Sequence, residues 1–309
     1  GSFTFLCLIF LGAGCSDNTQ KGQHGEFTSG FSLSPKSYDM LDFPRFVREV
    51  SNTSEVLLWA GEASELENSG SAPFVTANLS KNNGLKSIII TSPFRIEGNT
   101  VVGVFDEATR IRIQENVISF AQKEQPDYFG FGNEINFLYE QDQSLYKEFV
   151  TYFEEIQEDV HEVSPETKFF VVFQLERMKG LRGGLFGGIN SEDTDWEILS
   201  DFESADLFTF TTYPSLIYNN PSNIPEDYYA EIALRTKKPI AFSEFGWPSS
   251  LNVSGFDANE DEQDEFVRIF AQQTKHLQPA FIVWAFLYDQ DAPEPFTSMG
   301  LREKNGDKK

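Results

Sequence analysis

Cysteine and histidine are scarce in this chain. Its two cysteines, Cys7 and Cys15, both lie near the start, so the rest of the sequence has no thiol for a disulfide, a zinc site or a cysteine nucleophile. The three histidines are His24, His161 and His276, and none shares a short motif with another histidine or with a strand-end carboxylate. A metal-dependent hydrolase is therefore poorly supported, and we expect neither a metal nor a cofactor.

Basic residues are also few. Lys and Arg total 24 against 48 Asp and Glu, which gives a formal net charge of -24. A charge of this sign and size repels phosphate backbones and anionic lipid surfaces. We therefore expect no nucleic-acid partner, and we attribute the acidic surplus to solubility or a saline habitat.

The apolar run Phe3–Phe10 is too short to cross a bilayer, and small residues follow it up to Cys15. This is the arrangement of a signal-peptide core and its cleavage region. The stretch resembles the bacterial lipoprotein signal, in which cleavage occurs before a cysteine that is then acylated. The resemblance implies that residues 1–15 are a signal segment and that Cys15 is lipidated. A plain secretory signal is the alternative.

Either signal predicts a protein that leaves the cytoplasm. The lipoprotein reading places it in a bacterial cell envelope, periplasmic or associated with the outer membrane, and the alternative makes it secreted. The polar residues 16–26 are predicted to be a flexible tether. Under this interpretation the protein touches the membrane only through its lipid anchor.

Short β-type runs alternate with longer amphipathic segments along residues 27–309. Such alternation is typical of parallel strands joined by crossover helices, and a spacing of about thirty to forty residues suits the units of an eight-stranded barrel. The predicted strands are Phe27–Leu33, Glu55–Ala60, Leu85–Ser92, Asp127–Gly132, Lys168–Gln174, Leu207–Tyr213, Pro239–Ser243 and Ala280–Phe286. We therefore predict an α/β protein with a single-domain (β/α)₈ TIM barrel, and expect a monomer.

The clearest helix candidates by apolar spacing are Glu107–Glu124, Leu145–Val163 and Asp261–His276. The eighth unit differs from the others. After its strand, the chain runs through Asp289–Thr297 to charged residues where a closing helix would be expected. We therefore predict that the eighth helix is missing.

Two short motifs carry a glutamate at the end of an apolar β-type run. They are Gly130–Asn136, with the sequence GFGNEIN, and Ser243–Ser249, with the sequence SEFGWPS. A glutamate that ends a buried strand and precedes turn residues lies at the rim of a sheet rather than on a solvated helix. The active site of a (β/α)₈ barrel is built at this rim. Two such carboxylates are the minimum apparatus for cutting a glycosidic bond.

The other strand-end residues are amides, carboxylates and aromatics. This mixture suits a sugar, which presents hydroxyls at its edge and C–H faces to aromatic rings. The carboxylates Glu62, Glu176 and Asp289 are rivals to the motif glutamates, but no partner motif accompanies them. Besides the motif residues, the strand ends offer Trp59, Glu62, Arg95, Gln174, Glu176, Tyr213, Trp284, Tyr288 and Asp289.

These residues resemble the clan of retaining glycoside hydrolases that have (β/α)₈ barrels with catalytic glutamates on strands four and seven. Gly132-Asn133-Glu134 is similar to the clan's Asn-Glu at strand four, and Glu244 lies in a segment similar to that of strand seven. The Gly-Trp-Pro sequence that ends this segment is nearest to the endo-β-1,4-galactanase and β-1,3-glucanase families. Tyr213 and Trp284 resemble the strand-six tyrosine and strand-eight tryptophan of the clan.

The resemblance implies a role for each matched residue. Glu134 would be the acid/base and Glu244 the nucleophile. Asn133 would bind the 2-hydroxyl of the sugar, and Tyr213 would hold Glu244. Trp284 would form the floor of the subsite, and core packing is the alternative for this ring. Further substrate contacts are expected from the aromatic platforms Trp59 and Trp247 and from Arg95, which would replace the arginine that many members carry near strand two.

We therefore predict retaining hydrolysis of β-glycosidic bonds in a poly- or oligosaccharide. The clan's usual histidine near strand four or six is not evident, and neither is its strand-two arginine. These gaps, together with the tether, leave an alternative from another class. The alternative is a catalytically silent carbohydrate-binding lipoprotein of the cell envelope. The sequence does not distinguish galactan, glucan and mannan, or endo from exo action.

Overall fold

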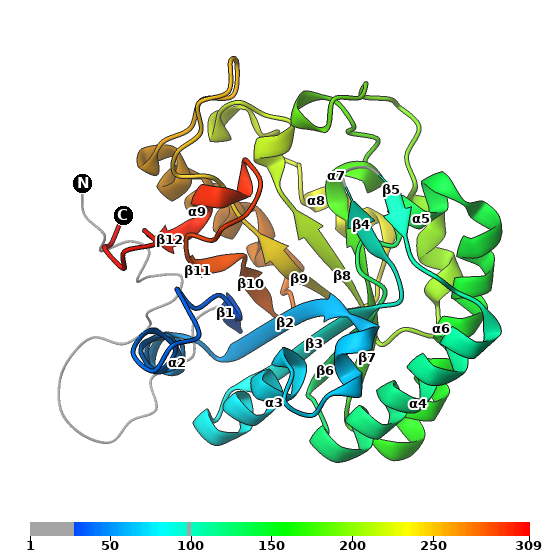
Figure 1. Ribbon diagram of the computed structural model, residues 1–309. Coiled ribbons are helices and arrows are strands. Elements are labelled where there is room, and N and C mark those ends of the chain that lie inside the picture. The colour runs from blue at the N-terminus through cyan, green and yellow to red at the C-terminus, as the bar shows by residue number, and fades with distance from the viewer. Residues whose placement is uncertain (1–27, 98–99) are drawn as a thin grey trace.

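The computed structural model describes residues 28–97 and 100–309 of the chain (Figure 1). The signal-type segment, the lipidation candidate Cys15 and the tether at 16–26 lie outside the described residues, so the predictions about them stay predictions. None of the helices in the described part of the chain is both long enough and apolar enough to cross a membrane.

Within the described residues, eight parallel strands close into a barrel in which β1 pairs with both β2 and β10. This confirms the predicted TIM barrel and all eight of its strands. Going around the barrel, the order is β1, β10, β9, β8, β7, β6, β3 and β2. Their bounds are β1 (Ser29–Ser32), β2 (Val56–Glu62), β3 (Lys86–Ser92), β6 (Tyr128–Phe131), β7 (Lys168–Gln174), β8 (Leu207–Thr212), β9 (Ile240–Phe245) and β10 (Ile282–Trp284).

Helices surround the barrel (Figure 1). Asp106 and Asn259 cap the N-termini of α4 and α9 by accepting hydrogen bonds from backbone N–H groups of the first turn. The α-helices are α2 (Asp42–Thr53), α3 (Ala72–Asn83), α4 (Glu107–Glu124), α5 (Asn136–Gln141), α6 (Gln143–Val163), α7 (Leu175–Met178), α8 (Ala230–Arg235) and α9 (Glu260–Thr274). The 3₁₀ turns are η1 (Ala63–Glu67), η2 (Gly184–Phe186), η3 (Trp196–Phe202), η4 (Pro214–Leu216), η5 (Pro221–Asn223), η6 (Lys275–Leu277) and η7 (Phe296–Ser298).

Two small sheets lie outside the barrel, and the sequence pattern did not predict them. β4 (Arg95–Glu97) and β5 (Thr100–Val102) form an antiparallel pair between β3 and α4. β11 (Phe286–Tyr288) and β12 (Gly300–Arg302) pair in parallel after β10. Among the described residues after β10 there is no α-helix.

The core has two layers, which follow from the period-two alternation of side chains along each strand. In β2, Val56 and Leu58 join a cluster of strand residues that fills the barrel, whereas Leu57 and Trp59 pack outward among helix residues. Gly130 leaves room in the interior for a large ring, since a Cβ at this position would come within 2.6 Å of Phe170. The barrel interior is therefore solid, and substrate can be held only above it, at the rim.

Candidate active site

A cavity of about 570 Å³ lies beyond the C-terminal ends of several strands. Residues at the ends of β6, β7 and β8 form its floor, and the loops after β3, β7, β9 and β11 form its walls. The described residues that line it are Ile96, Glu134, Phe137, Gln174, Leu185, Phe186, Tyr213, Leu216, Leu251, Val253, Glu294, Pro295 and Phe296. The cavity is thus mostly apolar with a few convergent polar groups, which is the composition of a small-molecule or glycan site.

The turn after β6 delivers Glu134 to this cavity. Gly132 has φ of 91°, and a Cβ there would lie 2.6 Å from the Phe149 ring, so the position requires glycine. Glu134 has φ of 50°, a left-handed conformation that costs a non-glycine residue about 1–3 kcal/mol. The next residue anchors the turn, because the Ile135 N–H donates to the Val172 carbonyl at 3.0 Å. The surrounding fold therefore holds Glu134 in a backbone conformation that is unfavourable for an isolated glutamate.

A second tie joins the ends of β6 and β7. The Asn136 side chain, which is fully buried, donates from Nδ2 to the Gln174 carbonyl and accepts from the Gln174 N–H, both at 3.0 Å. These two hydrogen bonds have the same donor and acceptor pattern as a backbone pairing, and they continue the pairing of β6 with β7 beyond the end of β6. Gln174 faces the cavity because it lies on the same inward face of β7 as Phe170 and Val172, two residues beyond Val172. Asn136 belongs to the first glutamate motif, but no sequence pattern indicates that its side chain joins β6 to β7.

Glu134 is partly exposed at the cavity floor, and its Oε1 accepts a hydrogen bond of 2.6 Å from Thr211 Oγ1 on β8. Burial, with a smaller contribution from the negative charges of Glu244 and Glu176, raises the pKa of the Glu134 carboxyl to about 7, against the lowering effect of the hydrogen bond from Thr211. A carboxylic acid with a pKa near neutrality can give up and recover a proton at physiological pH. The position therefore suits an acid/base.

A β-bulge turns Glu244 toward the same region. Phe210 pairs with Phe242 but Thr211 pairs with Glu244, so Ser243 is the extra residue on β9. Phe242 and Phe245 both contact Phe270 of α9, on the outside of the barrel. Strict alternation would send Phe245 inward. The bulge instead places Glu244 on the inner side between two outward phenylalanines, a use of bulges common beside active sites.

Tyr213 holds the Glu244 carboxyl. Its hydroxyl donates to Glu244 Oε2 at 2.6 Å, and its ring lines the cavity. Burial raises the pKa of the Tyr213 phenol well above its usual value, and the charge of Glu244 adds to this, so the hydroxyl stays a donor. Burial also raises the pKa of Glu244, whereas the hydrogen bond from Tyr213 lowers it. The tyrosine therefore favours the ionised form of Glu244.

The end of β8 holds both glutamates. Thr211 donates to Glu134 and is the register partner of Glu244, and Tyr213, two residues further on, donates to Glu244. The negative charge of Glu244 is one of the causes that raise the pKa of Glu134. Glu134 accepts from a threonine hydroxyl, whereas Glu244 accepts from a phenol that lowers its pKa against the effect of burial. Their different surroundings give the pair the asymmetry that two-carboxylate chemistry requires.

Glu176, one of the rival carboxylates, is completely buried. Its Oε1 accepts from Thr212 Oγ1, the Tyr213 N–H and the Tyr228 hydroxyl, and its Oε2 accepts from Gln174 Nε2 at 2.5 Å. These four donors support the charge of a carboxylate taken out of water. Glu176 thus positions Tyr213, which holds Glu244, and Gln174 of the cavity floor.

The three tryptophans expected to form sugar platforms are buried in the core, so these predictions are wrong. Trp59, Trp247 and Trp284 are 6%, 1% and 0% exposed. In β10 the alternation puts Val283 inside the barrel and Trp284 outside, where its Nε1 donates to the Met299 carbonyl at 2.8 Å. Trp247 packs on Phe266 of α9. A ring enclosed on both faces cannot stack on a sugar.

Besides Tyr213, the aromatic rings that line the cavity are phenylalanines. Among the described lining residues these are Phe137, Phe186 and Phe296. Phe296 meets the Tyr213 ring edge to face at 5.0 Å, and the guanidinium of Arg177 lies 3.8 Å from the centroid of Phe137. Sequence reasoning missed all three, because the chain has 31 phenylalanines and the core accounts for most of the ones the structure describes.

The remaining predicted contacts lie at the edge of the site. Arg95 is half exposed on β4, where it pairs with Glu97 at 2.7 Å and approaches Glu62 at 4.0 Å. Its neighbour Ile96, not Arg95, lines the cavity. Asn133 is partly exposed in the turn before Glu134. The described residues contain no group of three or more His, Cys, Asp or Glu side chains placed to hold a metal ion.

Comparisons with known proteins identify the fold. No protein-family model and no curated protein sequence matches the chain. Among solved structures, a mutant β-1,3-glucanosyltransferase of Rhizomucor miehei in complex with laminaritriose is similar at a TM-score of 0.65 and 11% identity, over 92% of this chain and 96% of that one. The catalytic domain of a GH53 protein of Ignisphaera aggregans is similar at a TM-score of 0.60 and 13% identity, over 94% of this chain and 96% of that one.

A mutant GH5 protein of Bifidobacterium longum subsp. longum, in complex with Manβ1-4GlcNAc, has a TM-score of 0.66 at 12% identity, over 92% of this chain and 75% of that one. At these identities the likeness establishes a shared fold. The chain therefore has the barrel found in several proteins that act on or bind glycans. Its chemistry has to be argued from its own residues.

Proposed function

We propose that this protein hydrolyses β-glycosidic bonds of a poly- or oligosaccharide with retention of configuration, using Glu134 as acid/base and Glu244 as nucleophile. The observation that carries the proposal is the shared support of the two carboxyls by one strand end, where Thr211 bonds Glu134 and Tyr213 bonds Glu244. The fold of the similar solved structures and the glycans named with two of them support it further.

In the first step the protonated Glu134 donates its proton to the glycosidic oxygen that departs. The Glu244 carboxylate attacks the anomeric carbon, so the bond from that carbon to the leaving oxygen breaks as an ester bond to Glu244 forms. The products of this step are the free alcohol of the leaving sugar and a glycosyl ester on Glu244. Glu134, having lost its proton, is now a carboxylate.

In the second step Glu134 acts as a base. It takes a proton from a water molecule as the water oxygen attacks the anomeric carbon and the ester bond to Glu244 breaks. The free sugar leaves with its original anomeric configuration, because two inversions have occurred. Both glutamates return to their starting protonation states, so no other reactant is required.

The other residues act on binding and charge. The Tyr213 hydroxyl keeps Glu244 ionised and oriented. Asn133 precedes the acid/base, and we assign it to the 2-hydroxyl of the sugar, a contact that strengthens as charge develops. Phe296 and Phe186, rather than tryptophans, offer the apolar faces on which a sugar ring packs.

The pH dependence follows from the two carboxyls. Glu134 must be protonated to act as the acid, and its pKa is about 7, so kcat/KM should fall as pH rises through about 7. Glu244 must be ionised, and burial raises its pKa above the ordinary 4.5, so activity should also fall on the acid side. We expect a bell-shaped profile when kcat/KM for a neutral oligosaccharide is measured from about pH 4 to about pH 9. Activity that keeps rising above pH 7 would assign the acid role to another group.

The function is tested by product analysis. The native chain is incubated with a panel of β-linked galactans, glucans and mannans, and reducing ends are measured. A variant with both Glu134→Gln and Glu244→Gln is the matched control, since it keeps the shape of the site without its acid and nucleophile. Release of reducing ends by the native chain alone is the expected result. Binding without release on the whole panel would favour the carbohydrate-binding alternative.

A further inference from the structure

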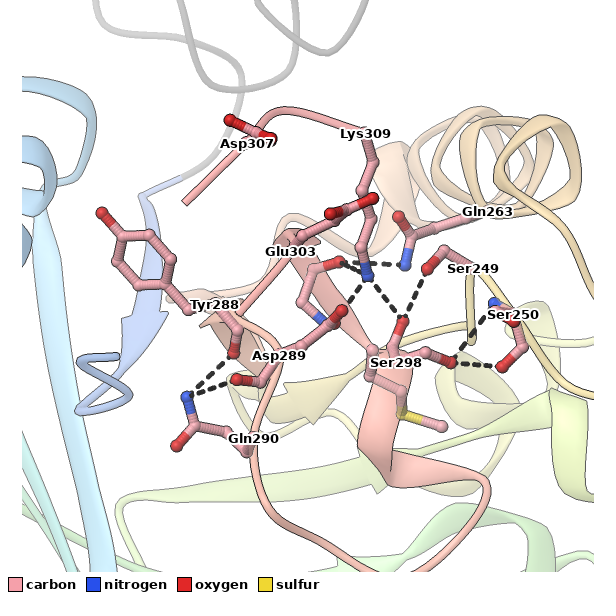
Figure 2. Close-up of polar contacts among 12 residues, drawn as sticks. Ser249, Ser250, Gln263, Tyr288, Asp289, Gln290, Ser298, Glu303, Asp307 and Lys309 are labelled. Carbon is pink, nitrogen blue, oxygen red and sulfur yellow. Dashed lines mark hydrogen bonds and ion pairs between the residues drawn. The ribbon is translucent and has the colours of Figure 1, made fainter. Parts of the chain in front are cut away.

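The ammonium group of Lys309 lies in an enclosed polar site (Figure 2). Its Nζ donates to Asp289 Oδ1 at 2.5 Å, to the Gly300 carbonyl at 2.9 Å and to the Ser298 carbonyl at 3.1 Å. A lysine ammonium has three donors and no acceptor, so three acceptors satisfy it completely. The Lys309 side chain is 5% exposed and that of Asp289 is 18% exposed. This ion pair is therefore a buried one.

The three acceptors close the base of one segment, residues 289–300, which we name the rim segment. Asp289 begins it after β11, and Ser298 and Gly300 end it at β12. Asp289 Oδ1 also accepts from the Gly300 N–H at 2.9 Å. The middle of the rim segment lines the cavity through Glu294, Pro295 and Phe296. Lys309 thus joins the two ends of a loop whose centre forms a wall of the candidate active site.

The same contact reaches the loop that follows the Glu244 strand. The Ser298 carbonyl, which accepts from Lys309, also accepts from the Ser249 N–H and from Ser249 Oγ, both at 2.9 Å. Gln263 of α9 adds a further tie, since its Nε2 donates to the Trp247 carbonyl at 2.7 Å. Figure 2 shows Ser249, Gln263 and Ser298 gathered around the Lys309 ammonium. Two walls of the cavity therefore share one anchor.

Two side-chain contacts connect the rim segment to Glu244. Phe296 of the rim segment packs edge to face on Tyr213 at 5.0 Å, and Tyr213 donates to Glu244. Removing one member of a buried ion pair leaves the other charge without its partner, which is strongly destabilising. Without the ammonium, Asp289 and two carbonyls at the base of the rim segment would turn toward water. Glu294 and Phe296 would then lose their fixed positions.

We propose that Asp289 Oδ1 and the carbonyls of Ser298 and Gly300 form a socket for a primary ammonium ion, and that Lys309, by filling it, is a positioning residue for glycan binding at the cavity. The substrate part of this inference rests on the proposed function. The socket part does not, because it concerns only how the chain binds an ammonium group.

The test uses the chain with Lys309→Ala. This change removes the ammonium and three methylenes, the volume of a propylammonium ion. We expect KM for an oligosaccharide substrate to rise about tenfold while kcat changes less than about threefold, because the wall of the binding site is loosened but the two glutamates remain. Propylammonium chloride should restore much of the loss. Tetramethylammonium chloride at equal ionic strength should not, since it has no N–H to donate.

Two further variants are controls. Lys308→Ala removes the same charge from the exposed neighbouring residue and should leave KM unchanged. Lys309→Met keeps the apolar stem in place. It should reproduce the rise in KM without any response to propylammonium, because the methionine side chain fills the space that the methylenes of Lys309 occupy in the native chain. If Lys309→Ala does not fold, the methionine variant supplies the KM measurement.

The melting temperature provides a readout that does not depend on activity. Propylammonium should raise the melting temperature of Lys309→Ala, and should not raise that of the native chain or of Lys308→Ala. An equal response of Lys309→Ala to both ammonium salts would overturn the socket, and an unchanged KM in both Lys309 variants would overturn the positioning role. If the native chain cleaved no glycan while propylammonium still stabilised Lys309→Ala, the proposed function would fail and the socket would stand.

Discussion

Replacing Glu244 with alanine is expected to lower kcat by about 10⁴- to 10⁶-fold, the range seen when a catalytic nucleophile is removed. The variant keeps the acid Glu134 and the cavity, so it can still bind a glycan and protonate the leaving oxygen. Sodium azide should restore turnover, because the small anion can enter the space left by the carboxylate and attack the anomeric carbon itself. The product should be a glycosyl azide of inverted configuration, identified by NMR and mass spectrometry.

Glu62→Ala is the matched control for this experiment. Glu62 is also a glutamate at the end of a barrel strand, but it lies beside Arg95 and is half exposed. Its loss should leave kcat within about twofold, as for most exposed positions away from a site. Full activity of Glu244→Ala would remove Glu244 from the mechanism, and so would recovery by azide that yields no glycosyl azide.

Replacing Glu134 with alanine should have an effect that depends on the leaving group. For a natural glycan, whose leaving alcohol needs a proton, we expect a loss of about 10²- to 10⁴-fold. For an aryl glycoside with an acidic phenol, the first step needs little protonation and should stay fast. The glycosyl ester on Glu244 would then accumulate, because no base activates water. A burst of phenol followed by slow turnover is the observation that checks this.

Azide separates the two glutamates in a second way. In Glu134→Ala it should attack the glycosyl ester and give an azide of retained configuration, opposite to the product expected with Glu244→Ala. The fall of kcat/KM through about pH 7 should also disappear, because Glu134 is the group whose pKa is about 7. Equal losses for natural and aryl substrates, with an unchanged pH profile, would contradict the acid/base role.

The sequence predicted the frame of the molecule well because the frame follows from local periodicity. Each of the eight apolar runs was predicted from β-rich composition and the turn or helix signals around it, and all eight are strands of the barrel. The two glutamate motifs could be placed at the rim because strand-end position is readable from an apolar run that stops at Gly132 or continues into Gly246. Whether a side chain at a strand end faces the cavity or the core depends on the register of single residues. Composition does not determine that register.

Trp284 and Glu244 show this limit. β10 spans three residues, too few for an alternating pattern to tell inside from outside, so Trp284 could be assigned to a sugar as easily as to the core. Glu244 faces inward only because Ser243 is an extra residue relative to β8. A bulge has no sequence pattern of its own. The motif, not the periodicity, located the carboxylate.

Long-range contacts set the rest of the site. Phe296 lines the cavity because the rim segment packs on Tyr213, which follows β8, and Lys309 binds both ends of that segment. Neither residue belongs to a motif. Each gains its place from tertiary packing, so a phenylalanine among 31 and a lysine among charged neighbours carried no signal.

The stereochemistry of the first sugar released tests the central claim most directly. Proton NMR of the native chain acting on the β-linked oligosaccharide that it cleaves best would follow the anomeric signals in the first minutes, before mutarotation. Two displacements at Glu244, with Glu134 as acid and then base, predict that the β-anomer appears first and the α-anomer only later. Initial appearance of the α-anomer would mean direct attack by water, and the assignment of Glu244 as the nucleophile would be wrong.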